Sequence, residues 1–409
     1  MSQPSVDSLF IEAVAAGLQG RRVRWEPLPP ETWKALFPLA QSQKLLPLLV
    51  DAVCQCPNAL EDPGFPALRG AARAQVLLQT RKDAALSAIL ARLREADIPV
   101  LVVKGRLCRA VYPNGALRPS SDEDLLTEED RFQEACGVLA AAGLRPEGPE
   151  DAAPAPELGW RSPDGLLFLE LHQYLFAPDS GPFGLLQTVF EAPFSRAEDY
   201  RLEDGTRLRS LSPHDHLLYL LLHAMKHFIH TGFGLRQICD VGLWAARWQS
   251  RVDWTLLLRQ TEQVRGAVFC AALFRLAEER LGISLALPAS WRELAPDPEP
   301  MLRDLLEGGV YGSSTMTRAH TARITQDAVA AQRRGGRAGL RSALFPPAES
   351  LAGDYPELKA HPALLPLVWQ KRLLRYLRGA GASRANKPAE TLRLGRQRLA
   401  LLREYGILE

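Results

Sequence analysis

The sequence predicts an α+β fold in which a small mixed β-sheet lies between two helical regions. Apolar residues recur at helical spacing through the first part of the chain and again through its last part. Between these parts lie short apolar or β-branched runs bounded by turn residues, which are typical of strands. We therefore divide the chain into an N-terminal helical region (1–97), an α/β core (98–211) and a C-terminal helical region (212–409).

The N-terminal region should be almost entirely helical. Prolines and glycines interrupt its helical pattern at several points, which divides it into separate helices. The four segments that we expect to be helices are Val6–Leu18, Glu31–Ser42, Leu48–Val53 and Leu68–Ala96.

The core begins with a predicted strand at Ile98–Val103, which breaks at Lys104-Gly105 and leads into a short helix. The chain then returns as a second strand over Asp122–Leu126. After it, Thr127–Asp130 resembles a capping box that starts a helix reaching about Ala142.

Further strands are predicted later in the core. A loop over Arg145–Pro156 precedes a buried strand at Leu166–His172. Arg201–Arg209 could form another strand or a hairpin.

The C-terminal region opens with a helix that is capped by Ser212, carries Pro213 in its first turn and ends at Gly232. The remainder is rich in helix to about Leu281 and again over Ala363–Leu408. Between these parts, 333–341 and 345–347 are predicted to be irregular.

Composition excludes few functions. With 46% hydrophobic and 23% charged residues, a chain of 409 residues can form a large core, and its net charge of +2 argues neither for nor against a polyanionic partner. The N-terminus lacks a signal-peptide pattern, and no apolar run is long enough to span a membrane, so we expect a soluble cytoplasmic protein. The six cysteines are scattered, which favours reduced thiols over disulfides or a zinc site at Cys54 and Cys56.

Acidic residues on two strands suggest a metal site. Side chains alternate along a strand, so Asp122 and Asp124 should point to the same face, where a bound cation would relieve their repulsion. Glu170 on the later strand is the residue that we expect to complete this site as third ligand or base. Lys104 and Gly105 form a basic turn that could bind phosphate at a helix N-terminus.

Arg118 and His172 are further candidates for nucleotide binding. Arg118 precedes the strand that carries the two aspartates, and it could contact phosphate or pair with Glu123. His172 shares a strand face with Glu170, although a hydrogen bond to the backbone under a helix is favoured over a site role.

Four histidines, His216, His223, His227 and His230, share one face of the predicted helix that starts at Ser212. Packing of this helix against the core is the favoured explanation. A role in substrate binding or base stacking is the alternative, and a zinc site at His223 and His227 with Asp240 is the weakest of the three.

These motifs carry a family resemblance. VVKG, LRPSSDEDLL, FLELH, LSPHDHLLYLLLHAMKH and LRQICD occur in an order that resembles the bacterial, uncharacterised nucleotidyltransferase family of the DNA-polymerase-β-like superfamily. The resemblance implies two Mg²⁺ ions, or Mn²⁺, held by Asp122, Asp124 and Glu170. It also implies a phosphate-binding turn at Lys104 and Gly105. The acid between the aspartates, Glu123, is usually apolar in such enzymes, so it must be exposed or paired with an arginine.

The resemblance leads to one main hypothesis and two alternatives. The main one is metal-dependent transfer of a nucleoside monophosphate from an NTP to a hydroxyl or phosphate of a small molecule, peptide or protein. The same site could instead transfer a sugar from a nucleotide-sugar. Because of Glu123, a degenerate protein that binds nucleotide without chemistry is the third hypothesis.

Nucleic acid is the least favoured partner. Arginine-rich helices without interleaved aromatic residues are more often solvated than nucleic-acid-binding. The arginines concerned are Arg333, Arg334, Arg337, Arg341, Arg372, Arg375, Arg378, Arg393, Arg396 and Arg398.

Overall fold

The computed structural model describes residues 4–148, 156–230, 232–308, 316–333, 345, 348–351, 355, 357–371 and 388–409. The predicted irregular segments over 333–341 and 345–347 lie outside these ranges, apart from residues 333 and 345. The same holds for six of the ten C-terminal arginines, namely Arg334, Arg337, Arg341, Arg372, Arg375 and Arg378.

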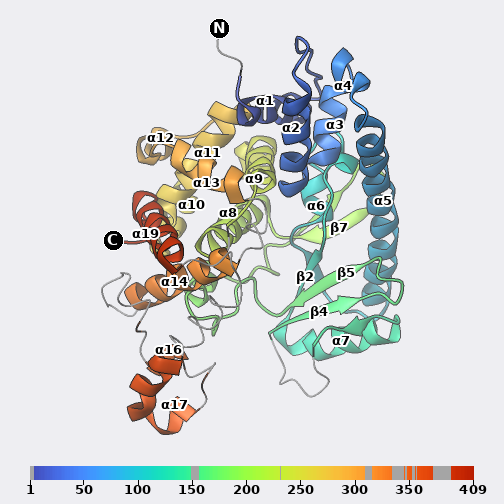
Figure 1. Cartoon of the computed structure of the whole chain (residues 1–409). Helices are drawn as coiled ribbons and strands as arrows, with labels where there is room; N and C mark the ends of the chain where they lie inside the picture. Colours follow the sequence, from blue (N-terminus) through green and yellow to red (C-terminus); the bar gives the residue numbers. More distant parts are fainter. Residues whose placement is uncertain are drawn as a thin grey trace.

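A five-stranded mixed sheet forms the centre of the molecule and confirms the α+β fold class (Figure 1). Its strands lie in the order β1, β2, β5, β4, β3, and only β2 and β5 pair in parallel. Their bounds are β1 (Val100–Val102), β2 (Glu123–Thr127), β3 (Arg145–Pro146), β4 (Glu157–Arg161) and β5 (Phe168–His172).

Alternation along the strands gives the sheet two different faces. Leu125 and Leu169 pack in a core that includes α5 (Phe65–Glu95) and α7 (Phe132–Ala141). Leu126 points the other way, into the main core, which it shares with α8 (Pro213–Ile229). Figure 1 shows α5 along one side of the sheet and α8 with α9 (Leu235–Trp248) on the other.

The N-terminal helices agree with the predicted segments. They are α1 (Val6–Leu18), α2 (Pro30–Ser42), α3 (Leu46–Val53), the short α4 (Pro57–Glu61) and α5. The last of these starts before the predicted Leu68 because Pro66 sits in its first turn, where a missing backbone N–H costs nothing.

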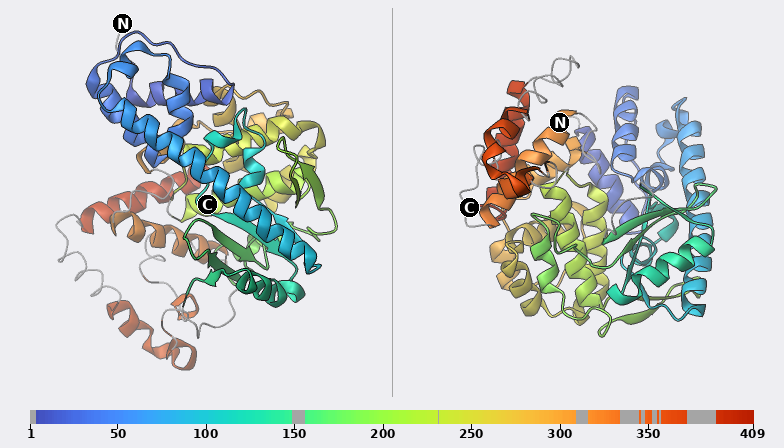
Figure 2. Two further views of the ribbon diagram at one scale, coloured as in Figure 1. Left: turned by 90° about the vertical axis from the view of Figure 1, so that its right-hand side faces the viewer. Right: turned by 90° about the horizontal axis from the view of Figure 1, so that it is seen from below.

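The described parts of the C-terminal region are helical, as predicted, and 372–387 of the predicted helical part Ala363–Leu408 lies outside them. The Ser212 hydroxyl accepts the Asp215 N–H at 3.1 Å, which confirms the cap of α8. The helices that follow α9 are α10 (Trp254–Gln263), α11 (Ala267–Leu281), α12 (Ala289–Leu294), α13 (Glu299–Gly308), α14 (Met316–Arg333), α16 (Ala348–Leu351), α17 (Glu357–Ala360) and α19 (Pro388–Glu404). Figure 2 shows α14 and α19 beside each other, outside the helices that adjoin the sheet.

Short elements connect the larger ones. A two-stranded hairpin forms at the predicted place, from β6 (Glu198–Arg201) and β7 (Arg207–Ser210). The remaining elements are α6 (Arg106–Arg109), η1 (Gly115–Leu117), η2 (Glu129–Arg131), η3 (Gly184–Val189), η4 (Gln249–Arg251) and η5 (Pro362–Leu364).

Two local predictions were wrong. Thr127 does not cap a helix, because it ends β2 and its hydroxyl donates to the Pro99 carbonyl at 3.0 Å, and α7 begins only at Phe132. The predicted loop over Arg145–Pro156 contains β3 at its start, which pairs with β4 just after it.

Three further observations concern the composition. None of the helices in the described ranges has the length and apolar character needed to cross a membrane. All six cysteines are free thiols. Arg398 is buried, donating to the Phe228 carbonyl and pairing with Asp304, whereas Arg393 and Arg396 are exposed.

Candidate active site

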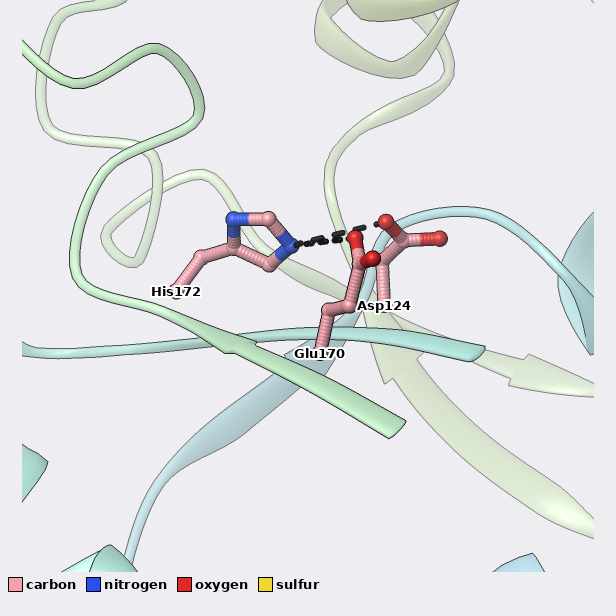
Figure 3. A group of neighbouring side chains, drawn as sticks. All are labelled: Asp124, Glu170 and His172. Carbon is pink, nitrogen blue, oxygen red and sulfur yellow. Dashed lines mark ion pairs between the residues drawn. The ribbon is translucent and has the colours of Figure 1, made fainter. Parts of the chain in front are cut away.

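Two neighbouring strands bring three chemically active side chains together. In the parallel pair of β2 and β5, Asp124 lies opposite Glu170, and His172 follows two residues later. Because Leu126 packs toward α8, alternation places Asp124 on that same face of the sheet. Figure 3 shows the three side chains pointing toward one another, and we call them the carboxylate–histidine cluster.

The cluster has the dimensions of a metal site. One ligand atom from each of the three residues lies within 4.8 Å of the others. The Nε2 atom of His172 is 3.4 Å from Asp124 Oδ1 and 3.7 Å from Glu170 Oε2, as the dashed lines in Figure 3 mark. No other such group of at least three ligands occurs among the residues that the structure describes.

The chemistry of the cluster fits a divalent cation. The Nε2 atom of His172 is buried and makes no hydrogen bond, although three carboxylates surround the ring. Two carboxylates and one imidazole are ligands that Mn²⁺ accepts, and the carboxylates also suit Mg²⁺. His172 therefore lies in the carboxylate–histidine cluster, and the predicted hydrogen bond to the backbone is not found within the described part of the chain.

Electrostatics keep the cluster ionic without a metal. Burial by itself would lower the pKa of His172, but Asp124, Glu157 and Glu170 outweigh burial and raise it well above 6.5. Burial would raise the pKa of Asp124, yet Lys104 and His172 hold it well below its usual range. The cluster is thus an array of paired charges.

Lys104 lies against the cluster from the α8 side. Its Nζ atom is 2.9 Å from Asp124 Oδ2 and 3.3 Å from His223 Nε2. Burial alone would lower the pKa of Lys104, but Asp124 and Asp122 raise it well above 10.5, so the ammonium stays charged. An internal cation therefore sits beside the proposed metal ligands.

Asp122 lies next to this site but outside the cluster. It is half-buried just before β2, and it lines a small pocket of about 50 Å³ that we call the α8–α9 pocket. This pocket lies against Lys104 and is formed mainly by residues of α8 and α9. The polar residues that line it include Lys104, Asp122, His223, His227, Arg236 and Gln237.

Glu123 points away from the cluster and is paired, which is one of the two alternatives that the sequence allowed. It is 1% exposed, and its Oε1 atom is 2.9 Å from Arg109 Nη1. Its Oε2 atom accepts the backbone N–H of Arg106 at 2.8 Å. A β-carbon at Gly105 would come within 1.9 Å of the same oxygen. The glycine turn therefore makes room for the Glu123 carboxylate. This carboxylate accepts the Arg106 N–H, which is the backbone amide predicted to face phosphate.

Arg118 is held by a buried carboxylate other than Glu123. Its Nε and Nη2 atoms donate to Asp240 at 2.8 and 2.6 Å, and Tyr112 donates to the same carboxylate at 2.7 Å. The predicted pairing of Arg118 with Glu123 is therefore wrong. Asp240 is likewise engaged and does not complete a site with His223 and His227.

The histidines of α8 have two different environments. His216 is fully buried, stacks near Trp244 and donates from Nε2 to the Val103 carbonyl at 2.7 Å, so it joins the helix to the sheet as expected. His223 and His227 line the α8–α9 pocket with their Nε2 atoms 3.2 Å apart. Burial lowers the pKa of His227 to about 3 and that of His223 well below 6.5, so both rings are neutral.

His216 gives a pH-dependent prediction. Burial lowers its pKa to about 3, whereas the unfolded chain binds a proton near pH 6.5. The neutral ring of His216 therefore contributes to the free energy of unfolding above pH 6.5, and this contribution is lost as the pH falls toward 3. Between pH 7 and 5 the loss is about 2 kcal/mol. In urea unfolding, the free energy of unfolding of His216→Gln should fall by about 2 kcal/mol less than that of the unchanged protein between pH 7 and 5. Glutamine keeps a donor for the Val103 carbonyl.

Exposed His361 supplies the control for this measurement. His361→Gln should lose as much stability on acidification as the unchanged protein does. If the curves of His216→Gln and the unchanged protein run parallel between pH 7 and 5, the neutral buried state of His216 is wrong.

Some residues of the site could not be predicted from the motifs. Glu157 on β4 approaches His172 Nδ1 at 3.4 Å, but the sequence pattern predicts no strand over β4. Arg236 at the start of α9 lines the pocket, and only its place in the LRQICD motif singled it out.

An α+β core with acids on adjacent strands and a lysine beside them is typical of enzymes that act on phosphate groups. The model of the uncharacterised nucleotidyltransferase family matches residues 29–282, more than half of the chain. The chain belongs to this family and is a nucleotidyltransferase. Neither the curated proteins nor the solved structures include a match to it.

Proposed function

We propose that the protein uses a divalent cation to transfer a nucleoside monophosphate from an NTP to a hydroxyl or phosphate group and releases pyrophosphate. The acceptor would be a small molecule, a peptide or a protein. The observation that carries the proposal is the carboxylate–histidine cluster, which lies beside a charged lysine in a chain of the nucleotidyltransferase family.

Asp124, Glu170 and His172 would hold the cation, with Mg²⁺ and Mn²⁺ as the candidates. Asp122 would bind a second ion shared with Asp124. Both carboxylates lie close enough to Lys104 to raise its pKa, so they face the same region of the site. Bound divalent cations neutralise the charge of the phosphates and lower the pKa of an attacking hydroxyl. Glu170, which is partly exposed, could accept the proton of that hydroxyl.

Lys104 and the sheet edge would position the donor. The Lys104 ammonium neutralises Asp124 in the free protein and is close enough to contact a phosphate that enters beside it. Gly105 contributes by leaving room for the Glu123 carboxylate, which lies above the turn. Arg118 would act through Asp240 and shape the pocket wall that faces the phosphates.

Labelled donors test this function. The protein is incubated with each α-³²P-labelled NTP, Mg²⁺ or Mn²⁺ and a fractionated mixture of metabolites, peptides and proteins. We expect the label on one acceptor fraction together with release of pyrophosphate, and no transfer by the variant that carries both Asp122→Asn and Asp124→Asn. Transfer from a sugar-labelled nucleotide-sugar, with none from any NTP, would overturn the proposal.

Asp122 provides a graded prediction. Asp122→Asn should lower kcat by about a hundredfold, because a carboxylate that faces the proposed metal–phosphate complex loses its charge. Stability should change little, since Asp122 is half-buried and its hydrogen bond from Ser121 can be kept by asparagine. Single-turnover kinetics measure the effect, and Glu128→Gln, at an exposed position just after β2, is the control. Unchanged kcat in Asp122→Asn would remove Asp122 from the mechanism.

A further inference from the structure

The turn that should bind phosphate has no free amide at its first helical residue. The N–H of Arg106 is donated to Glu123 Oε2, and the space above Gly105 is filled by the same carboxylate. Glu123 is fixed there by Arg109 and is almost fully buried. A donor phosphate must therefore be bound by other groups near Lys104.

Arg236 offers such a group on the opposite wall of the α8–α9 pocket. It is 8% exposed, and its Nη1 atom donates to the Pro119 carbonyl at 2.7 Å. Its Nε atom is buried and has no hydrogen-bond partner within the described ranges. Asp240 attracts Arg236 only from beyond ion-pair distance, because its carboxylate is bound by Arg118. A buried guanidinium with no direct ion pair is unfavourable, so an anion that binds here gains a strong partner.

The charges of the pocket single out Arg236. The other two cations that line it are neutralised, Lys104 by Asp124 and Arg118 by Asp240. Among the lining residues, all of which the structure describes, Arg236 is the one cation without an ion pair. His223 and His227 are neutral and add polar groups without adding charge.

The start of α9 adds to the attraction for an anion. Arg236 and Gln237 lie in its first turn, where the helix dipole is positive. Gln237 uses Oε1 to accept the Gly234 N–H at 2.7 Å, so its amide group is left as a donor at the pocket. The space of about 50 Å³ suits a compact group rather than a base or a sugar ring.

Asp122 decides the form in which the anion enters. Its carboxylate lines the same pocket and would repel a bare phosphate. A divalent cation between Asp122 and the phosphate would turn this repulsion into attraction. The pocket thus favours a metal-bound polyphosphate over free phosphate.

We propose that the α8–α9 pocket binds the terminal phosphates of the NTP donor, with Arg236 and Gln237 as binding residues. This inference rests on the proposed function, because that function supplies the triphosphate. It places the pyrophosphate leaving group against the start of α9.

Calorimetric titration of inorganic pyrophosphate with Mg²⁺ tests the proposal without any acceptor. We expect Arg236→Gln to weaken pyrophosphate binding by about tenfold or more, because a charge-assisted interaction is lost. Binding of a nucleoside monophosphate, and of Mn²⁺ measured by electron paramagnetic resonance, should stay unchanged. Arg247→Gln, on the exposed side of the same helix, is the matched control.

Gln237→Glu is a second variant that should keep the fold. A glutamate at this position still accepts the Gly234 N–H and suits a helix N-terminus, but it brings a negative charge to the pocket. It should weaken pyrophosphate binding by about tenfold or more while the thermal unfolding midpoint stays the same.

The outcomes separate this inference from the proposed function. If the unchanged protein does not bind pyrophosphate with Mg²⁺, or if both variants bind it normally, the pocket assignment is wrong. If Arg236→Gln consumes an NTP with unchanged KM, the protein is still a nucleotidyltransferase, but the assignment of the pocket to the terminal phosphates is wrong. If pyrophosphate binds through Arg236 but no NTP is ever consumed, the pocket is a pyrophosphate-binding site and the proposed nucleotidyl transfer is wrong.

Discussion

Asp124→Asn should lower nucleotidyl transfer by about a thousandfold or more and should abolish binding of Mn²⁺. Asp124 is the member of the cluster that contacts both His172 and Lys104, and it is 2% exposed. Loss of a metal-ligand charge removes several kcal/mol of transition-state stabilisation, and each ~1.4 kcal/mol is a factor of ten in rate.

Metal binding and rate should be measured together on this variant. Glu128→Gln, at an exposed position next to β2, serves as the control and should match the unchanged protein in both. Thermal unfolding is recorded as well, because the neutral amide of Asp124→Asn would leave the Lys104 ammonium without its counter-ion. A folded Asp124→Asn protein that binds Mn²⁺ normally, or retains more than a tenth of the activity, would contradict the metal assignment.

Gly105→Ala should destabilise the protein by at least about 4 kcal/mol. Gly105 has φ +53° and ψ −112°, a conformation that lies outside the left-handed helical region and that glycine adopts far more readily than an L residue. The new methyl would lie 1.9 Å from Glu123 Oε2 and would force this carboxylate away from Arg109 and from the Arg106 amide. Breaking a buried ion pair by itself costs about 3–5 kcal/mol.

Gly165 is a control for a positive φ without a steric contact. It also has a positive φ, of +68°, but a methyl there would meet no atom within 4 Å. Gly165→Ala should therefore cost only about 1–2 kcal/mol in urea unfolding. Equal losses in the two variants would mean that Glu123 does not occupy the space above the turn.

A double-mutant cycle can isolate the contact itself. Glu123→Ala removes the oxygen that the new methyl would strike, at the expense of its bonds with Arg109. In that background, Gly105→Ala should cost much less than it does alone. Additive losses would contradict the direct contact between the two positions.

The sequence predicted elements whose pattern is local. The helices α1 and α8 were found because their apolar spacing is a local pattern, and the cap of α8 was found because Ser212 directly precedes that pattern. Strand β4 was missed because Gly159 and two charged ends hide its alternation, and it exists through pairing with β5. The period of two placed Asp124, Glu170 and His172 correctly on their strands.

The partners of buried charges could not be predicted in the same way. Arg118 pairs with Asp240, which lies more than a hundred residues further along the chain, and no local pattern links them. The sequence did show that Glu123 must be either exposed or paired, with an arginine as the expected partner, since a buried charge must be compensated. It could not show that Arg109 is that arginine, or that Arg236 would lack an ion pair.

The contact between Lys104 and Asp124 has a consequence for folding in the cell. Because the lysine already balances the buried carboxylate, the chain does not depend on an inorganic ion to neutralise its core. Newly made protein can therefore fold with this carboxylate already neutralised, before any ion or nucleotide binds.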